Sequence, residues 1–352
     1  MKIALTADIH LTSRQQHPER FAALENIFTQ LHALQLDTLV IAGDLHDASY
    51  DNFSEFEALC RLPENCTIQV WVIPGNHDPN ISQSAITADN VRIFSQPELV
   101  SLDLTGMSLL FIPYQVGKAM GEAIAGFVDH LQAGRWVLVG HGDWIGNVKI
   151  ANPYEPGIYM PLSQREMDKY QPARAFLGHI HAPFDGPLVC YPGSPSGMDI
   201  TETGRRRFVT YDTLSNAVES HRVDSQTIYF NRTFTIFPVD NEAAAVEGML
   251  QAWIASWELT PPEKTKAQVR VKLSGYATDK NKLKQVVLNT LDGYKLIEEP
   301  NLDEVSVTTD LRRGQILNLV KEKIDGLNWP EDPDEPGRDQ ILLSAIQRVY
   351  GK

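Results

Sequence analysis

Short apolar segments that each end in acidic or histidine-rich sequence recur through the first half of this chain. Residues 2–7, 38–42 and 70–73 have the length and apolar character of buried strands. Between the first two, apolar residues recur at helical spacing from Phe21 to Leu34. Buried strands that alternate with amphipathic helices build a sheet covered by helices, so this pattern predicts an α/β fold.

Strands dominate from about residue 91, and the pattern changes again near Asp224. The strands predicted before that point suit a two-sheet α/β sandwich. After it, strands alternate with helical stripes up to residue 297, and two more helices are predicted at 311–324 and 339–350. We therefore expect a first domain at 1–224, a smaller α+β domain at 225–305 and C-terminal helices in a tail at 306–352.

Composition excludes several classes of protein. The 352 residues include 31 Lys and Arg against 45 Asp and Glu, and the formal charge of −14 excludes nucleic-acid binding through general basicity. The three cysteines form no Cys-x-x-Cys pair, and no apolar run approaches the ~20 residues of a membrane span. Asp8 and His10 interrupt the N-terminus before a signal-peptide core could form. We expect a reduced, cytoplasmic protein with no membrane contact.

Five polar segments follow predicted strands of the first domain. Ligand sites in α/β sheets lie at the carboxyl ends of the strands, so these segments are expected to meet at one edge. Each segment alone is typical of a turn or a cap, and the hypothesis depends on all five occurring in order after strands. The segments are Asp8-Ile9-His10, Gly43-Asp44-Leu45-His46-Asp47, Gly75-Asn76-His77-Asp78, Gly140-His141-Gly142-Asp143 and Gly178-His179-Ile180-His181.

The side chains of these segments suit two divalent metal ions. Imidazole together with carboxylate favours Mn, Fe or Zn over Ca or Mg alone. Two neighbouring ions need a shared ligand, and Asp44 is the natural bridging carboxylate. The alternation in His179-x-His181 lets both rings leave one face of an extended segment, so each ion would take one of them. The remaining predicted ligands are Asp8 and His10 for the first ion, and Asn76 and His141 for the second.

The complete set resembles the calcineurin-like metallophosphoesterase superfamily, whose pattern is D-x-H, G-D, G-N-H-D/E, G-H and G-H-x-H. The match runs from residue 3 to about residue 181 with every element present. The resemblance implies a two-sheet α/β sandwich with a dimetal site at one edge, and Mn as the expected metal with Mg, Fe or Zn as alternatives. It implies that Asp8, His10, Asp44 and His181 hold the first ion and that Asp44, Asn76, His141 and His179 hold the second.

Two divalent ions in such a site imply phosphoester hydrolysis. A water between two cations loses a proton near neutral pH and attacks phosphorus in line. His77 is not needed as a ligand, so we expect it to act as general acid or transition-state stabiliser. Asp78 would orient the His77 ring, with a plain turn residue as the alternative.

A further segment points to one branch of the superfamily. Tyr191-Pro192-Gly193-Ser194-Pro195, together with the opening Asp8-Ile9-His10-Leu11, resembles the SbcD-type DNA-repair exonucleases, the nuclease subunits of double-strand-break repair complexes. This resemblance implies a capping domain, C-terminal helices that bind the coiled coil of an ABC-type ATPase, and a homodimer. Asn76-His77-Asp78, which is not the Asn-His-Glu of protein phosphatases, argues against that branch.

Several residues are candidates for contacts with substrate. His46 is either a phosphate contact or a plain loop histidine, because the position at which some SbcD-type proteins carry a phosphate-holding histidine is Asp47 here. Arg14 lies in a short loop that could approach substrate. Ser194 either contacts a ligating loop or forms a turn. The run at 205–207, Arg-Arg-Arg, either contacts DNA phosphates or stays solvated at the end of a strand.

Three functions are therefore open. The leading hypothesis is a Mn-dependent DNA exonuclease or endonuclease. A small-molecule or cyclic-nucleotide phosphodiesterase is the alternative that the acidic composition favours. The chain could also act chiefly as a docking subunit for the ATPase, through apolar stripes that would otherwise pack on its own second domain. The stripes are Ile316, Leu317, Val320 and Ile324, and Ile341, Leu342, Ala345 and Val349.

Overall fold

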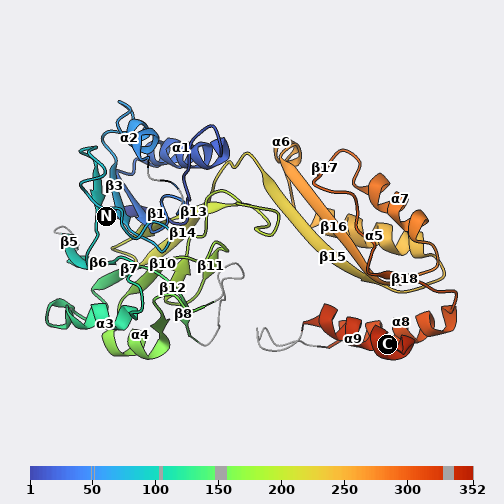
Figure 1. Cartoon of the computed structure of the whole chain (residues 1–352). Helices are drawn as coiled ribbons and strands as arrows, with labels where there is room; N and C mark the ends of the chain where they lie inside the picture. The colour runs from blue at the N-terminus through green and yellow to red at the C-terminus, as the bar shows by residue number, and fades with distance from the viewer. Residues whose placement is uncertain (49, 51, 103–105, 147–156, 328–336, 352) are drawn as a thin grey trace. The chain divides into compact units, whose positions relative to one another are not determined.

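A computed structural model divides the chain into two compact units (Figure 1). The first comprises Met1–Met198 and Arg205–Gln226, and the second comprises Asp199–Gly204 and Thr227–Lys352. The structure describes all residues except 49, 51, 103–105, 147–156, 328–336 and 352. The main division at Gln226 lies close to the boundary expected at residue 224, whereas 199–204 group with the second unit.

The first sheet of the first unit is built around parallel strands in the order β14-β13-β1-β2-β3-β4. The parallel strands are β1 (Lys2–Thr6), β2 (Thr38–Ala42), β3 (Gln69–Ile73) and β4 (Val91–Ile93). β13 (Arg207–Asp212) pairs antiparallel with β1 and with β14 (Ala217–Arg222). Every residue of β2 is buried, because helices or the second sheet cover each face, and the strand therefore has a continuous apolar sequence.

The second sheet has the order β11-β12-β10-β7-β6-β5. Its centre is parallel, with β10 paired to β12 on one side and β7 on the other, and β7 paired to β6. The strands are β5 (Glu98–Leu102), β6 (Met107–Ile112), β7 (Trp136–His141), β10 (Arg174–Gly178), β11 (Phe184–Asp185) and β12 (Val189–Tyr191). A separate pair, β8 (Trp144–Ile145) and β9 (Leu162–Ser163), follows β7.

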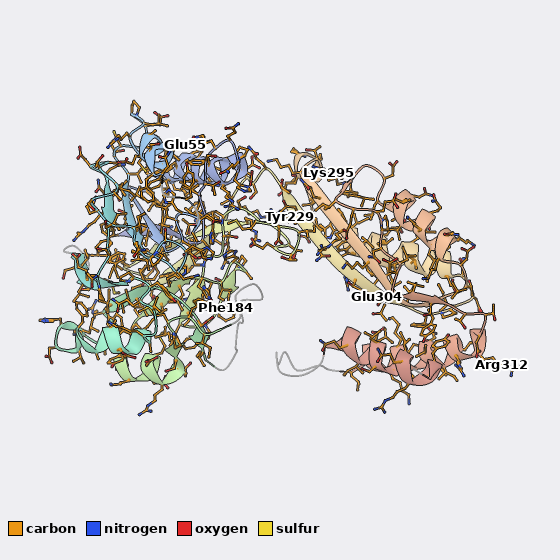
Figure 2. The ribbon with its side chains drawn as sticks, in the orientation of Figure 1. Glu55, Phe184, Tyr229, Lys295, Glu304 and Arg312 are labelled. Atoms are coloured by element: carbon orange, nitrogen blue, oxygen red, sulfur yellow. The ribbon has the colours of Figure 1, made fainter. Side chains whose placement is uncertain are left out.

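Apolar side chains from both sheets fill the space between them (Figure 2). Ile3 and Val40 of the first sheet share this core with Phe111, Val137 and Phe176 of the second. α1 (Pro18–Leu34) and α2 (Ser54–Cys60) cover the outer face of the first sheet, and α3 (Met120–Ala125) and α4 (Gln164–Tyr170) cover that of the second. The predicted two-sheet α/β sandwich is confirmed.

The two helices on the second sheet were not predicted from the sequence. α3 has six residues and α4 has seven, so neither extends beyond two turns. Helical periodicity is detected over 11 or more residues, and these segments are too short to carry it. The Ser163–Glu166 capping box at the start of α4 is a local signal that could have indicated that helix.

The second unit is a smaller sheet of parallel strands. β15 (Ile228–Ile236) and β16 (Ala267–Ala277) form its long central pair, and β17 (Lys295–Leu296) and β18 (Val305–Val307) lie beside β16. α5 (Glu242–Ala255) and α7 (Lys280–Thr290) pack on its apolar face, and α6 (Pro261–Lys264) precedes β16. Pro261-Pro262 begins α6, because proline suits the first helical turn.

The two C-terminal helices pack on the second unit. α8 (Leu311–Asp325) and α9 (Arg338–Tyr350) form a core with Phe237 and Tyr276 of that unit. Leu317, Ile324 and Leu342 lie inside this core, so the stripes expected in a separate tail pack largely on the chain itself. Ile316 and Leu319 remain exposed on α8. None of the helices in the described part of the chain combines the length and apolar character of a membrane span.

Candidate metal centre

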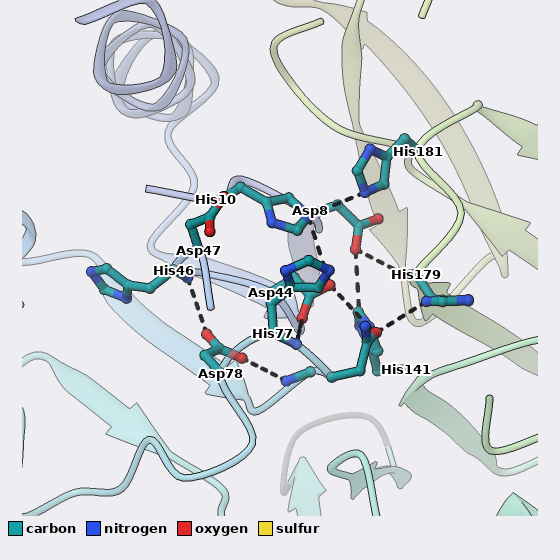
Figure 3. A network of polar contacts seen from close by, with 12 residues as sticks. Asp8, His10, Asp44, His46, Asp47, His77, Asp78, His141, His179 and His181 are labelled. Carbon is teal, nitrogen blue, oxygen red and sulfur yellow. Dashed lines mark hydrogen bonds and ion pairs between the residues drawn. The ribbon is translucent and has the colours of Figure 1, made fainter. Parts of the chain in front are cut away.

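Five strand ends from both sheets bring the polar segments together (Figure 3). Asp8, Asp44 and Asn76 follow the parallel neighbours β1, β2 and β3. His141 ends β7, and His179 follows β10, its parallel neighbour in the second sheet. Because parallel strands present their carboxyl ends at the same edge, one edge of the sandwich collects all five segments.

The backbone at this edge is held in an uncommon conformation. Asp8, His10, Asp44 and His179 have φ angles of 54°, 51°, 50° and 92°, in the left-handed region. Such residues cost of order 1–3 kcal/mol each and persist where the surroundings hold them. Backbone hydrogen bonds between the segments do this: the amides of Asp8 and His10 donate to the carbonyls of Gly43 and Asp44 at 3.1 and 3.0 Å.

One group of ligand atoms is formed by Asp8, His10 and His181. Their ligand atoms all lie within 4.8 Å of one another. The Nε2 atoms of His10 and His181 are 3.1 Å apart, although the two residues are 171 positions apart in sequence. The Oδ1 atom of Asp8 accepts the amide of His179 at 2.8 Å, and Oδ2 is buried with no hydrogen-bond partner among the described residues. A buried, unsatisfied carboxylate oxygen is the donor that a cation requires.

A second group surrounds Asn76. Its Oδ1 atom lies 2.8 Å from Nε2 of His141 and 3.0 Å from Nδ1 of His179. The Nδ1 atom of His141 is 2.9 Å from the carbonyl oxygen of Ala42. That contact orients the ring and turns Nε2 toward the centre, as in metal sites where a backbone carbonyl supports a ligating histidine.

Asp44 lies between the two groups. Its Oδ2 atom is 3.3 Å from Nε2 of His141 and 3.7 Å from Nε2 of His10. Its Oδ1 atom accepts the amide of His77 at 2.8 Å. One carboxylate therefore reaches histidines of both groups. The donor set of carboxylates, imidazoles and one amide fits two divalent transition metals.

The electrostatics of the centre also favour cations. Burial raises the pKa of Asp8 to about 6. Burial alone would also raise the pKa of Asp44, but His141 and His10 hold it well below its usual range. Burial lowers the pKa of His10 to about 3, so this imidazole is neutral and ready to ligate. Burial would lower the pKa of His141 too, but Asp44 raises it to about 9, and a cation could replace that proton.

Three glycines permit the close approach of the segments. A Cβ atom at Gly43 would lie 2.0 Å from the His141 ring, and φ is +94° there. At Gly75 it would lie 2.1 Å from Oδ1 of Asp44, and at Gly178 it would lie 2.0 Å from the Ala42 carbonyl oxygen. Space requires glycine at all three positions, and backbone conformation is a second reason at Gly43.

Comparisons with known proteins identify a family for this chain and two similar proteins. The family model for calcineurin-like phosphoesterases matches residues 1–183, slightly more than half of the chain. The chain belongs to the calcineurin-like phosphoesterase family. It is 35% identical over 244 residues to a probable cyclic nucleotide phosphodiesterase of Coxiella burnetii, a match that covers 63% of this chain and 96% of that protein. The solved structure of TT1561 from Thermus thermophilus is 11% identical, with a TM-score of 0.40, over 63% of this chain and 98% of that one.

His77 and Asp78 of this phosphoesterase make different contacts. The His77 ring packs edge-on against His10, with 4.6 Å between centroids, and forms a further ligand-like group with His10 and Asp44. Asp78 accepts the amides of His46 and Gly75 at 3.0 and 2.7 Å. Asp78 therefore joins the second and third segments. From the sequence it was expected either to orient the His77 ring or to be a plain turn residue.

The three candidate substrate contacts have different surroundings. His46 is 1% exposed and packs against Phe53 and Phe56, and it points away from the cluster in Figure 3. Burial lowers its pKa to about 3, so it is a neutral core residue rather than a phosphate contact. Arg14 pairs with Glu25 at 2.5 Å. Ser194 is buried, and its amide donates to the carbonyl of His181 at 3.1 Å. This is the contact with a ligating loop that was one of the two alternatives for Ser194.

Two buried arginines lie beside the centre in places that the sequence did not predict. Arg20 donates from Nη1 to the carbonyl of His10, and Arg206 donates from Nη1 to that of His181 at 2.9 Å. A signal existed for Arg20, because it shares the buried stripe of α1 with Leu24, Ile27 and Leu31. A charged residue on an otherwise apolar stripe indicates a specific internal partner. Arg206 belongs to the basic run at 205–207, which was expected either to contact DNA or to stay solvated, and it is 2% exposed and so not solvated.

Gly75→Ala tests whether the close approach to Asp44 is needed. We expect metal affinity, measured by calorimetry with Mn²⁺, to fall about 10- to 100-fold because the new methyl group must displace Asp44. Gly126→Ala is the matched control, since its Cβ atom would meet only the Ala123 carbonyl oxygen, at 3.4 Å. Equal Mn²⁺ affinity in the two variants would contradict the proposed packing.

Proposed function

We propose that this phosphoesterase is a dimetal phosphodiesterase whose substrate is DNA, as in the SbcD-type exonucleases that the chain resembles. The observation that carries the phosphodiesterase assignment is the Asp44 carboxylate lying between two histidine groups. When bound, two divalent ions supply Lewis-acid stabilisation of phosphate charge and a more acidic water. Asp8, His10 and His181 would hold one ion, Asn76, His141 and His179 the other, and Asp44 both.

His77 is the residue proposed to act on the leaving group. Its amide is fixed by Asp44, and its ring lies at the partly exposed side of the first ligand group. A protonated imidazole at that position can donate to the departing oxygen or stabilise charge on the phosphate. Asp78 holds the backbone of this segment through Gly75, so it acts as a positioning residue.

The second unit supports a macromolecular substrate. The match to the Coxiella burnetii protein covers 63% of this chain, so more than a third lies outside it. In β16, buried Val269 and Val271 alternate with half-buried Arg270 and Lys272, which places two cations on the face away from the apolar core. Cations on one strand face are suited to phosphate contacts, although the charge of −14 makes binding salt-sensitive.

A cyclic nucleotide is the second candidate substrate. It is favoured by the 35% identity to a probable cyclic nucleotide phosphodiesterase, almost all of which is matched. The basic run at 205–207 also favours a small substrate. Arg206 donates to the His181 carbonyl and Arg207 pairs with Asp185 at 2.6 Å, so both side chains are used within the protein and not for DNA binding.

A double variant distinguishes these substrates. With Mn²⁺, we expect Arg270→Gln with Lys272→Gln to slow cleavage of linear DNA by about 10-fold at moderate salt, because two phosphate contacts are lost. Turnover of bis(p-nitrophenyl) phosphate, which has no nucleic-acid chain for these two cations to bind, is expected to stay unchanged. Lys264→Gln with Lys323→Gln removes the same charge from exposed helices as a control. Rapid hydrolysis of cyclic nucleotide without DNA cleavage would replace the first proposal with the second.

His77→Ala separates catalysis from metal binding. We expect kcat for bis(p-nitrophenyl) phosphate to fall by about 10²- to 10⁴-fold, the usual contribution of a general acid, with both Mn²⁺ ions retained. Loss of one ion in this variant would instead make His77 a ligand, as its group with His10 and Asp44 permits.

An ABC-type ATPase and a second copy of the chain are the proposed protein partners, carried by the resemblance to SbcD-type proteins. The exposed side chains Ile316 and Leu319 of α8 are the surface left for a coiled coil. Leu319→Glu is therefore expected to abolish co-purification with the ATPase while leaving phosphodiesterase activity intact. Undiminished co-purification would exclude this face of α8.

A further inference from the structure

The segment 192–195 supports the metal centre by contacting the main chain of a predicted ligand. The Ser194 amide donates to the carbonyl of His181 at 3.1 Å. Gly193 has a φ of +77°, and a Cβ atom there would lie 2.7 Å from the same oxygen. Arg206, 2% exposed, donates to it from Nη1 at 2.9 Å. The carbonyl of one predicted ligand is thus held by two donors that are distant in sequence.

His10 is held in the same way from another element. Arg20 of α1 is 8% exposed, and its Nη1 atom donates to the carbonyl of His10. His10 has a φ of 51°, so its main chain needs external support. The two supported residues are those whose Nε2 atoms face each other at 3.1 Å. Holding both carbonyls restricts the main chain from which the two rings extend.

The second ligand group is supported by a different contact. His141 is held through its ring, by Nδ1 against the Ala42 carbonyl at 2.9 Å. Asn76 and His179 are 3.0 Å apart through their side chains. The hydrogen bonds from Arg20, Arg206 and the Ser194 amide all go to His10 or His181 of the first group, so their loss is expected to weaken the first ion more than the second.

Energetics explain why arginine occupies these positions. Burying a guanidinium costs several kcal/mol, and a cation beside a metal site repels the ion. Nη1 of Arg20 lies 3.7 Å from Oδ2 of Asp47, which offsets part of this cost, and the hydrogen bonds to the His10 and His181 carbonyls add a geometric benefit. The rigid, multiply donating guanidinium can hold a carbonyl at a fixed angle, which lysine does less well.

We propose that Arg20, Arg206 and the Ser194 amide form a carbonyl clamp that positions His10 and His181 and thereby determines whether the first ion is bound. The clamp residues are positioning residues, since they touch the main chain of the ligands. The proposal rests on the dimetal centre and is independent of whether DNA or a cyclic nucleotide is the substrate.

The double variant Arg20→Met with Arg206→Met tests the clamp. Mn²⁺ stoichiometry by calorimetry and elemental analysis is expected to fall from two ions to one, with the affinity of the remaining ion within about threefold of wild type. The electron paramagnetic resonance spectrum should change from that of a spin-coupled pair to that of an isolated Mn²⁺. Retention of two ions at wild-type affinity, or loss of both together, would overturn the proposal.

Conservative and remote substitutions complete the experiment. Arg20→Lys and Arg206→Lys keep a donor and are expected to weaken the first ion by about 10-fold, less than methionine does. If the methionine variants fail to fold by circular dichroism, unchanged first-ion affinity in the lysine variants overturns the clamp. Arg222→Met, at an exposed position of β14, is expected to bind both ions normally. A wild-type chain that binds a single ion would remove the basis of the inference.

Discussion

Two carboxylates buried beside several imidazoles impose the constraint on which this structure depends. Asp8 and Asp44 are 0% and 1% exposed, and the pKa of Asp8 is raised by burial whereas that of Asp44 is lowered by neighbouring histidines. Burial raises the pKa of Asp8, and the negative charge of Asp44 adds to that shift. Divalent cations would stabilise both anions and could be bound by the neutral histidines. The two metals expected for the family therefore suit the local electrostatics.

The rest of the first unit keeps these groups together. Parallel strands of two sheets place five polar segments at one edge, and hydrogen bonds between the segments, such as that from the His10 amide to the Asp44 carbonyl, hold the left-handed residues. Gly43, Gly75 and Gly178 leave the space in which the loops approach one another. Outside this layer, buried arginines hold ligand carbonyls. The fold therefore supports the metal centre through main-chain contacts between the segments and through arginine side chains that bind main-chain carbonyls.

The same internal use of cations bears on substrate recognition. Arg206 and Arg207, the most basic run of the chain, are engaged within the first unit, by the His181 carbonyl and by Asp185. In the second unit, Arg270 and Lys272 lie on the strand face away from the core. Any DNA contact would therefore depend on a few local cations in a protein of net charge −14. Substrate choice is thus a matter of where these cations lie, and the chemistry of the centre suits either phosphodiester.

The sequence alone determined the sandwich, its parallel strands and the set of polar segments, because burial on both faces leaves continuous apolar runs and strand ends collect polar residues. It also separated the second unit through its change of period near Asp224. Only the tertiary structure decided which polar residues reach the centre. His46 turns into an aromatic core, Asp78 binds two amides, and Arg20 and Arg206 join ligands that are ten and twenty-five residues away. A side chain's direction depends on the φ angle of its own backbone and on packing from distant elements. The spacing of residues along the sequence predicts neither.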